Sequence, residues 1–397
     1  MKTTEPSTKH VETQPAAGHT TKSGLGVMQL TDTLTAAGYE RVAVNLANDL
    51  PANRYRSYLC TTRRDGPLEE LIAPHVGRLR LQRAHRFDLG AVLRLVSYIR
   101  KNQIQILHAH GTTVFMSILA SRFQPHPAVI WHNHAGRLTA DEHPKLRWRL
   151  AARRIDGTIV VSQLLQQWCV RNLGMPPDRT WYVRNYVHMP DHVEPASSLP
   201  GQPNFRIVSV ANLLPDKDPL NLLRAMKIVA RESPSAHLLM VGRSGDSAYM
   251  EKVRAEMADA VLQGRVSMLG VRSDVASIMK GCDIGVLASA TEGLPLTLLE
   301  YGMAGLPVVT TRVGQCEEVL NGGRLGLLVP PSAPDELAQA ILSLLASPAR
   351  RAELGNRFQQ HVQENYSRDQ VLQQIGEVYA TVLASRTNVA GAGASRR

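Results

Sequence analysis

The sequence of 397 residues is poor in cysteine and in long apolar runs. Its four cysteines, Cys60, Cys169, Cys282 and Cys316, form no CxxC pair. This excludes a disulfide framework and favours a reduced, cytoplasmic protein. No run of about 18 apolar residues is present, so no transmembrane helix is expected. The polar N-terminal residues lack the apolar core of a secretory signal, so none is expected either.

The remaining composition is that of a folded protein, with 44% hydrophobic and 20% charged residues. At roughly 150 residues per domain, the length predicts two or three domains. The net charge of +11 is uneven, because residues 1–195 hold 25 Lys and Arg against 15 Asp and Glu. This basic half could face nucleic acid, a membrane surface or a phosphorylated acceptor, or it could be a solvated surface rich in arginine.

Short apolar runs alternate with amphipathic helical patterns over residues 25–190, which predicts parallel βαβ units. The expected strands are 26–31, 57–62, 104–110, 128–134, 157–162 and 180–185, and the expected helices include 40–50 and 89–102. Residues 1–24 and 386–397 lack this periodicity and are expected to be disordered tails.

A proline-rich stretch at 191–203 is expected to be an interdomain linker, and the alternation restarts over 204–365. The expected strands there are 205–211, 237–242, 266–270, 282–289, 306–311 and 326–330, with helices at 219–232, 249–263 and 335–347. The fold class is therefore α/β, with two doubly wound parallel-sheet domains. In such folds ligands bind at the carboxyl ends of the strands, and a cleft between the domains is the expected site.

The segment 290–311 carries the strongest chemical signal. Gly293 permits a tight turn after an apolar strand, and Pro295 suits the start of a helix over 296–304. The backbone N–H groups of Gly293 and Leu294 are then expected to point out of the helix N-terminus. They can bind phosphate or sugar oxygens.

Two carboxylates, Glu292 and Glu300, flank this turn. If the eight residues between them were helical, the carboxylates would lie roughly 12 Å apart. That exceeds the separation of about 5–9.5 Å in a glycosidase pair. They are interpreted as two separate groups that hold a ligand, and the alternative is a helix-capping glutamate and a surface glutamate.

Two basic residues follow strands of the second domain. Lys217 precedes a helix, where it can place a point charge on a diphosphate, or it is an exposed loop lysine. Arg243, in VGRSGD, faces a phosphate or the solvent; the motif is only half of a dinucleotide fingerprint.

Histidines end two strands of the first domain: His108, His110, His132 and His134. Two HxH pairs raise the possibility of zinc, but no Asp or Cys supports it, so no metal site is expected. One of these histidines is expected to bond a substrate hydroxyl. The basic helix 143–154 could lie on an anionic lipid surface or simply pack through its leucines.

Together these segments resemble the retaining glycosyltransferases of family 4, which have the GT-B fold of two Rossmann-like domains. The resemblance is strongest in EGLPLTLLEYGMAGLPVV, residues 292–309. It implies that Glu300 binds the nucleotide ribose and that Glu292, with Gly293 and Leu294, contacts the donor sugar. It implies that Lys217 neutralises the leaving diphosphate and that His110 lies near the reaction centre. A last helix over 366–385 is expected to pack back on the first domain.

Some positions depart from the family pattern. A basic residue often precedes the lysine, and Asn212 stands there, so its phosphate contact is missing or comes from Arg243. The acceptor-side loop, often Gly-Gly-x-Glu, here reads Ala37-Gly38-Tyr39-Glu40. The catalytic residues are thus expected to be His110, Lys217 and Glu292, with Asn212, Arg243 and Glu300 among the donor-binding groups and Gly38 on the acceptor side.

The expected function is transfer of a sugar from a nucleotide-diphosphate sugar to a hydroxyl of a glycan or polyprenyl-diphosphate-linked acceptor, in polysaccharide or lipopolysaccharide biosynthesis. No cofactor or metal is expected, because Lys217 and the helix N-terminus at Gly293 can stabilise the charge of the leaving diphosphate without one. Peripheral contact with the inner, anionic membrane face is expected, and nucleic acid is not expected as a partner. The alternatives are a nucleotide-sugar epimerase of the same fold and a non-catalytic basic protein that binds nucleic acid or membrane.

Overall fold

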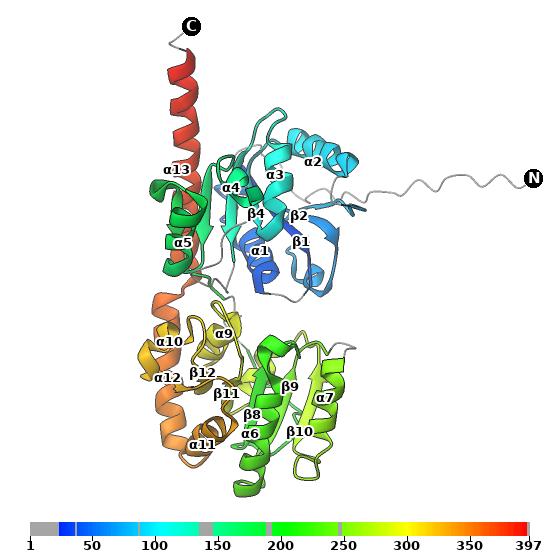
Figure 1. The fold of residues 1–397 in the computed structure, drawn as a ribbon, viewed down its shortest axis with the longest axis vertical. Helices are drawn as coiled ribbons and strands as arrows, with labels where there is room; N and C mark the ends of the chain where they lie inside the picture. Colours follow the sequence, from blue (N-terminus) through cyan, green and yellow to red (C-terminus); the bar gives the residue numbers. More distant parts are fainter. Residues whose placement is uncertain are drawn as a thin grey trace, which may run out of the picture. The chain divides into compact units, whose positions relative to one another are not determined.

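A computed structural model describes residues 24–35, 38–85, 88–134, 146–187, 193–244 and 248–394. The chain forms two compact units, the first made of residues 1–184 and 369–397 and the second of residues 185–368. Each unit contains one parallel β-sheet with helices packed against it (Figure 1), as the alternation predicted.

The N-terminal unit has a seven-stranded sheet in the order β3-β2-β1-β4-β5-β6-β7. Its strands are β1 (Leu25–Thr33), β2 (Tyr55–Arg64), β3 (Gly77–Arg80), β4 (Ile104–His110), β5 (Ala128–Asn133), β6 (Gly157–Val160) and β7 (Thr180–Tyr182). Its helices are α1 (Gly38–Asp49), α2 (Leu89–Asn102), α3 (Val114–Ala120), α4 (Leu146–Ala152), α5 (Gln163–Leu173) and α13 (Arg368–Ala394).

Helices cover both faces of this sheet because successive side chains of a strand point to opposite faces. Leu59 of β2 packs into the cluster that contains the buried side of α1. Its neighbours Tyr58 and Cys60 pack into the cluster of α2. The sheet is therefore doubly wound. Because helices cover both of its faces, polar side chains that can bind a ligand are expected at the ends of the strands.

The second unit has a six-stranded sheet in the order β10-β9-β8-β11-β12-β13. Its strands are β8 (Arg206–Val210), β9 (His237–Val241), β10 (Val266–Gly270), β11 (Ile284–Leu287), β12 (Val308–Thr311) and β13 (Leu327–Val329). Its helices are α6 (Pro219–Glu232), α7 (Ala248–Met257), α8 (Val275–Lys280), α9 (Leu296–Ala304), α10 (Cys316–Val319), α11 (Pro334–Leu345) and α12 (Pro348–Asn365). Ile207 and Val208, adjacent on β8, pack on opposite faces of this sheet.

Three of the differences between the structure and the sequence expectations concern where a helix, the linker and the C-terminal tail begin or end. The helix expected over 249–263 ends at Met257, where the Asp259 side chain accepts a hydrogen bond from the Val261 N–H and so competes with helical pairing. The stretch expected as a linker packs on the second unit from residue 193 onward. There the Arg206 guanidinium donates to the carbonyl oxygens of Leu199, Pro200 and Gly201.

The third difference concerns the C-terminal tail, expected to be disordered over 386–397. Helix α13 continues to Ala394, so that expectation is wrong for residues 386–394. Arg386 pairs with Asp156 at 2.7 Å and donates to the His126 carbonyl oxygen, which ties this part of the helix to the N-terminal unit. Residues 395–397, like residues 1–23 of the other expected tail, lie outside the described residues.

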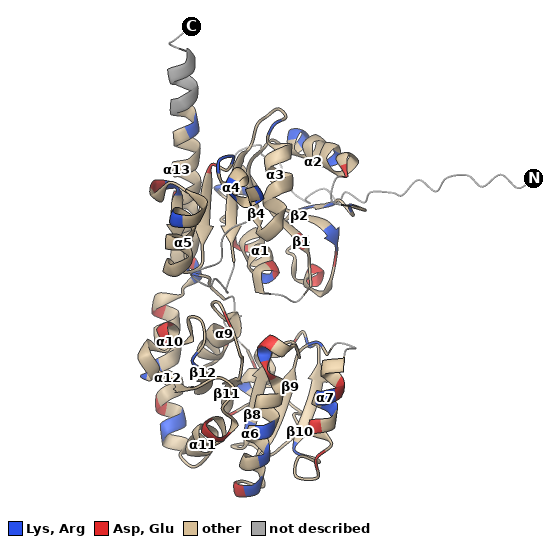
Figure 2. Cartoon of the chain, viewed as in Figure 1, with Lys and Arg blue, Asp and Glu red and all other residues tan. Residues whose placement is uncertain are grey.

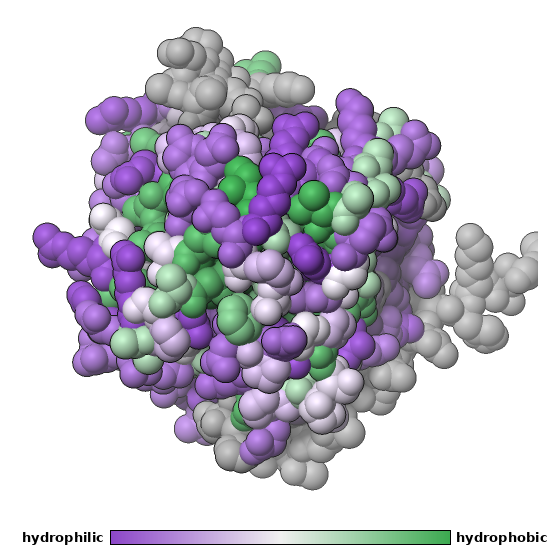
Figure 3. Space-filling model, turned by 90° about the horizontal axis from the view of Figure 1, so that it is seen from below, coloured by the Kyte–Doolittle hydropathy of each residue, from purple (hydrophilic) through white to green (hydrophobic). Residues whose placement is uncertain are grey.

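In Figure 3 hydrophilic side chains predominate, and apolar ones lie among them in small groups. Over the described part of the chain, no helix combines the length and the apolar content that a membrane span requires.

Candidate active site

Helix α9 is fixed to the end of β8 by its own side chains. The buried Tyr301 hydroxyl accepts from the Val210 N–H at 2.9 Å and lies 3.2 Å from the Val208 carbonyl oxygen, to which it can donate. Thr297 donates to the Val210 carbonyl oxygen at 3.2 Å. Gly305 ends the helix in the left-handed region at φ 74°, as the sequence predicted. The helix N-terminus is thereby held beside the carboxyl ends of the strands.

An ion pair lies at this edge of the sheet. Lys217, at the end of the short turn Pro215–Lys217, donates from Nζ to both carboxylate oxygens of Glu292 at 2.8 Å. Glu292 also accepts from the Ser289 hydroxyl at 2.7 Å. The Glu292 side chain is 7% exposed and that of Lys217 26%, so the cation is the more accessible partner.

Backbone bonds hold the two loops that carry this pair. The N–H groups of Ala290 and Thr291 both donate to the Asp216 carbonyl oxygen, at 3.0 and 3.3 Å. The pair therefore rests on two loops that are joined to each other, and its geometry does not depend on the long side chains alone.

A third loop presses on the same turn. Gly314 has φ +54°, and a Cβ there would come within 2.4 Å of the Gly293 carbonyl oxygen and 2.5 Å of that of Glu292. The Gln315 N–H donates to the Gly293 carbonyl oxygen at 2.9 Å. The N–H groups of Gly293 and Leu294 donate to no acceptor within the described residues. Two backbone donors thus remain for a ligand in the turn that follows Glu292.

The other residues expected at the site lie outside the Lys217–Glu292 pair. The Asn212 side-chain oxygen accepts from the Arg243 N–H at 3.1 Å, so this asparagine binds backbone and brings the loops after β8 and β9 together. The Arg243 residue is exposed. Glu300 is half-buried within α9, beyond the turn that holds Glu292. Gly38 is exposed and begins α1, and its neighbour Ala37 lies outside the described residues.

The histidines of the N-terminal unit form a two-by-two grid on β4 and at the end of β5. Along each strand the rings stack, with centroids 4.9 Å apart for His108 and His110 and 4.0 Å for His132 and His134. Between strands they bond through ring nitrogens, His108 Nε2 to His132 Nδ1 at 3.1 Å and His110 Nδ1 to His134 Nε2 at 2.9 Å.

Burial keeps all four rings neutral. It lowers the pKa of His108 and His134 to about 3 and that of His110 and His132 well below the usual value, with neighbouring histidines adding to the effect for three of them. A neutral imidazole has one N–H donor and one acceptor nitrogen. The tautomer of each ring therefore decides which of its hydrogen bonds it donates and which it accepts.

The bonded nitrogens of His108 and His132 face each other. The centroid distance between these two rings is 5.1 Å, which exceeds the distance between His108 Nε2 and His132 Nδ1 by about the two ring radii, so these nitrogens point toward each other in the ring plane. Nitrogens of His108, His110 and His132 also lie within 4.8 Å of one another, which is close enough to hold one metal ion. The expectation of no metal at the histidines therefore stays a prediction.

The structure distinguishes His110 from His132. Both His110 nitrogens are bonded, Nδ1 to His134 and Nε2 to the Gln29 side-chain oxygen at 2.9 Å, and the residue is 1% exposed. His132 is 2% exposed, and its Nε2 has no partner among the described residues. A buried polar atom without a partner requires an explanation. The substrate contact expected at His110 thus remains a prediction, while the available nitrogen belongs to His132, which the sequence did not distinguish.

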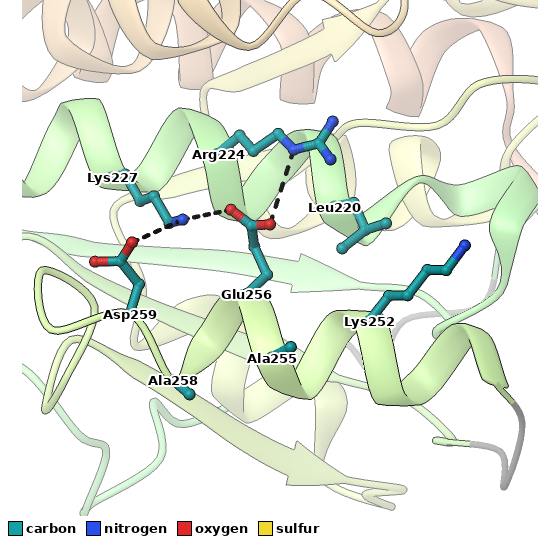
Figure 4. A pocket seen from close by; sticks show the side chains of 8 residues that line it. All are labelled: Leu220, Arg224, Lys227, Lys252, Ala255, Glu256, Ala258 and Asp259. Carbon is teal, nitrogen blue, oxygen red and sulfur yellow. Dashed lines mark ion pairs between the residues drawn. The ribbon is translucent and has the colours of Figure 1, made fainter.

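A hollow between α6 and α7 is not part of this site. Two of its three basic side chains are ion-paired: Lys227 with Glu256 and Asp259, at 2.5 and 2.8 Å, and Arg224 with Glu256 (Figure 4). We interpret the hollow as part of the ion-paired contact between the packed helices α6 and α7.

Two parallel αβ units, with a paired lysine and a helix N-terminus at strand ends of the second, are the architecture of the GT-B fold. The family model "Glycosyltransferase Family 4" matches residues 36–189, and the model "Glycosyl transferases group 1" matches residues 193–361. The chain belongs to glycosyltransferase family 4.

Relatives among characterised proteins agree. The chain is 30% identical over 387 residues to phosphatidyl-myo-inositol mannosyltransferase of Mycolicibacterium smegmatis, covering 94% of this chain and 93% of that protein. It is 24% identical over 274 residues to UDP-Gal:alpha-D-GlcNAc-diphosphoundecaprenol alpha-1,3-galactosyltransferase of Escherichia coli, covering 64% and 70%. A match at 28% identity to an exopolysaccharide phosphotransferase of Streptomyces coelicolor covers 60% of this chain and only 24% of that protein.

The fold has solved counterparts. Anabaena HepE in complex with UDP and glucose superposes with a TM-score of 0.76 at 20% identity, covering 90% of this chain and 100% of that one. At this identity the likeness concerns the fold alone. The two family models show that the chain is a glycosyltransferase.

Proposed function

We propose that this protein transfers a sugar from a nucleotide-diphosphate sugar to a hydroxyl of a glycan or lipid-linked acceptor, with retention of anomeric configuration and without a metal. The observation that carries the proposal is the Lys217–Glu292 pair beside the two unused N–H groups of Gly293 and Leu294. A leaving diphosphate gathers negative charge as the sugar–oxygen bond breaks. A fixed cation and a helix N-terminus stabilise that charge electrostatically.

The individual roles combine the charge and burial of each residue with the family resemblance. Lys217 and the N–H groups at the start of α9 bind the diphosphate. Glu292, already oriented by Ser289, accepts from donor-sugar hydroxyls, and Glu300 binds the ribose. His132 donates its unpaired Nε2 proton to a sugar hydroxyl oxygen. Lys217 supplies a positive charge where many sugar transferases use a divalent ion, which is why we propose metal independence.

The acceptor is proposed to be linked to a lipid. Two relatives carry lipid acceptors in their names, a diphosphoundecaprenol and a phosphatidylinositol. The N-terminal unit also exposes leucines one helical turn apart on α2 and α4. Both helices carry basic residues, which are blue in Figure 2. The exposed leucines are Leu89, Leu93, Leu146 and Leu150, with exposed fractions between 52% and 71%. Such helices suit an anionic membrane surface.

Donor binding is tested by thermal stabilisation with UDP-, GDP-, ADP- and TDP-sugars in the presence of EDTA. A ligand at about 100 times its dissociation constant adds roughly 2.7 kcal/mol. One nucleotide series should stabilise the wild type and Lys227→Ala but not Lys217→Ala. Lys227 is a matched control, because it is a similarly exposed, ion-paired lysine of the same unit. A stabilising shift seen only when EDTA is left out would refute metal independence.

The reaction itself is tested with a polyprenyl-diphosphate-linked sugar as acceptor. A transferase should release nucleoside diphosphate only when acceptor is present. An epimerase would convert the donor without any acceptor. The product linkage, read by NMR, should have the same anomeric configuration as the donor. An inverted linkage would contradict retention.

Membrane contact is tested by flotation with anionic and with zwitterionic vesicles. We expect the wild type to float with anionic vesicles only, and Leu146→Glu with Leu150→Glu to reduce this at least tenfold. Val271→Glu, at a residue of the second unit that is 53% exposed, is the control and should float normally. Equal flotation of all variants would contradict the proposed surface.

A further inference from the structure

The histidine grid continues into two residues that neither the family resemblance nor the proposed chemistry assigns. Gln29 of β1 lies beside His110 and also donates from Nε2 to the Tyr379 hydroxyl at 3.3 Å. Tyr379 comes from α13 and is fully buried, and its hydroxyl lies 2.7 Å from His108 Nδ1. Side chains of β1, β4, β5 and the last helix thus form one buried network.

The direction of each bond follows from its neighbours. The Tyr379 oxygen receives the Gln29 amide proton, and His108 Nδ1 is the acceptor described beside its own O–H, so the hydroxyl donates to His108 Nδ1. His108 then carries its proton on Nε2 and donates to His132 Nδ1. His132 carries its proton on Nε2, the atom that has no partner in the described chain.

The second branch is fixed by the same amide. The Gln29 oxygen accepts from His110 Nε2, so His110 Nδ1 must accept from His134 Nε2. Reversing the Gln29 amide would reverse every bond in both branches and leave His132 Nε2 as an acceptor. One amide and one hydroxyl therefore decide whether His132 offers a proton or a lone pair.

We infer that Tyr379, together with Gln29, is a positioning residue that holds His132 in the Nε2–H tautomer through His108, so that His132 meets its ligand as a hydrogen-bond donor. This inference rests on the proposed function only for the identity of that ligand, a sugar hydroxyl oxygen. Burial supports it, because it raises the pKa of Tyr379 far above neutrality and keeps the hydroxyl protonated. The assignment differs from a packing role, since it concerns one oxygen atom and not the ring.

The test removes that oxygen with Tyr379→Phe. Tyr55→Phe is the matched control, because Tyr55 packs edge-on against the Tyr379 ring at 5.9 Å and lies outside the network. The full-length proteins, labelled with ¹⁵N in histidine, report the protonated ring nitrogen by NMR without any substrate. We expect a single Nε2–H form of His132 in the wild type and Tyr55→Phe, and a mixture of tautomers in Tyr379→Phe. An unchanged His132 in Tyr379→Phe overturns the inference whatever the activity.

Kinetics supply the second readout. In Tyr379→Phe we expect kcat to fall about tenfold, the size of one net hydrogen bond, with the KM for donor changed much less. In a His108→Leu background Tyr379→Phe should have no further effect, because the path to His132 is already broken. Additive losses would show that Tyr379 acts by packing and would overturn the inference. A wild type without transferase activity refutes the proposed function, while the NMR result still decides the tautomer.

Discussion

Replacing Lys217 by alanine is expected to lower both the stability of the protein and its catalytic rate, and the two losses can be measured separately. The Glu292 carboxylate, 7% exposed, now accepts two bonds of 2.8 Å from Lys217 and one of 2.7 Å from Ser289. In Lys217→Ala, the hydrogen bond from the Ser289 hydroxyl is the one that remains of these three bonds to the Glu292 carboxylate. Leaving a buried acceptor short of partners costs about 1–3 kcal/mol. For a unit of this size each kcal/mol lowers Tm by about 2–4 °C.

The catalytic loss should be larger than the stability loss. Removing a preorganised group that stabilises developing charge lowers kcat by about 10²–10³. Calorimetry with a free nucleoside diphosphate separates the roles of the two partners. Lys217→Ala should lose the diphosphate-induced rise in Tm, whereas Glu292→Gln should keep it and lose only the extra rise that the sugar contributes.

A double variant completes the experiment. Combining Lys217→Ala with Glu292→Gln removes the uncompensated charge, so Tm should return toward the wild-type value while diphosphate binding stays absent. If Lys217→Ala alone keeps the wild-type response to the nucleoside diphosphate, the assignment of Lys217 to the leaving group is wrong. If the double variant is less stable than Lys217→Ala, the ion-pair argument is wrong.

Three further outcomes are expected. Burial depresses the folded-state pKa of His108 and His134 to about 3, so their contribution to stability is present above pH 6.5 and lost as pH falls toward 3, by about 1.4 kcal/mol per pH unit for each. Urea unfolding at pH 7.5 and 5.5 should show this slope, and His134→Asn should reduce it. Gly314→Ala should abolish donor binding through its contact with the turn, while Gly264→Ala, also at positive φ but with open space around it, should not; equal loss in both would point to backbone strain instead. Tyr301→Phe leaves a buried N–H unpaired and should lower stability by about 1–3 kcal/mol in urea titration, and an unchanged midpoint would contradict the anchoring role of its hydroxyl.

Elements with clear end signals were predictable from the sequence. Helix α2 begins after Asp88, whose side chain caps the Ala91 N–H, and its predicted bounds of 89–102 match the structure. Helix α9 ends at Gly305 as expected. By contrast, the short strand β3 was not predicted, because GRLR is too short and too basic to show an apolar run. Its two arginines are instead held by Glu69, a contact that only the fold creates.

The candidate site was predictable in its residue types but not in its partners. Lys217 and Glu292 were both expected to bind the donor, yet their ion pair spans 75 positions and follows only from the sheet order. His132 could not be distinguished from His110 in the sequence, because the difference depends on Gln29 and on Tyr379, which lies 271 positions from His108. The role of a buried imidazole is set by what occupies its other nitrogen, and periodicity carries no information about that.

The placement of α13 has a consequence for synthesis on the ribosome. Tyr379 and Arg386 complete the N-terminal unit, yet they are translated after the whole second unit. The nascent first unit must therefore wait with its imidazoles uncovered while residues 185–368 emerge and fold. Only α13 completes the N-terminal unit. The histidine network therefore forms after both units have been translated. A chain whose translation stops before α13 lacks this network.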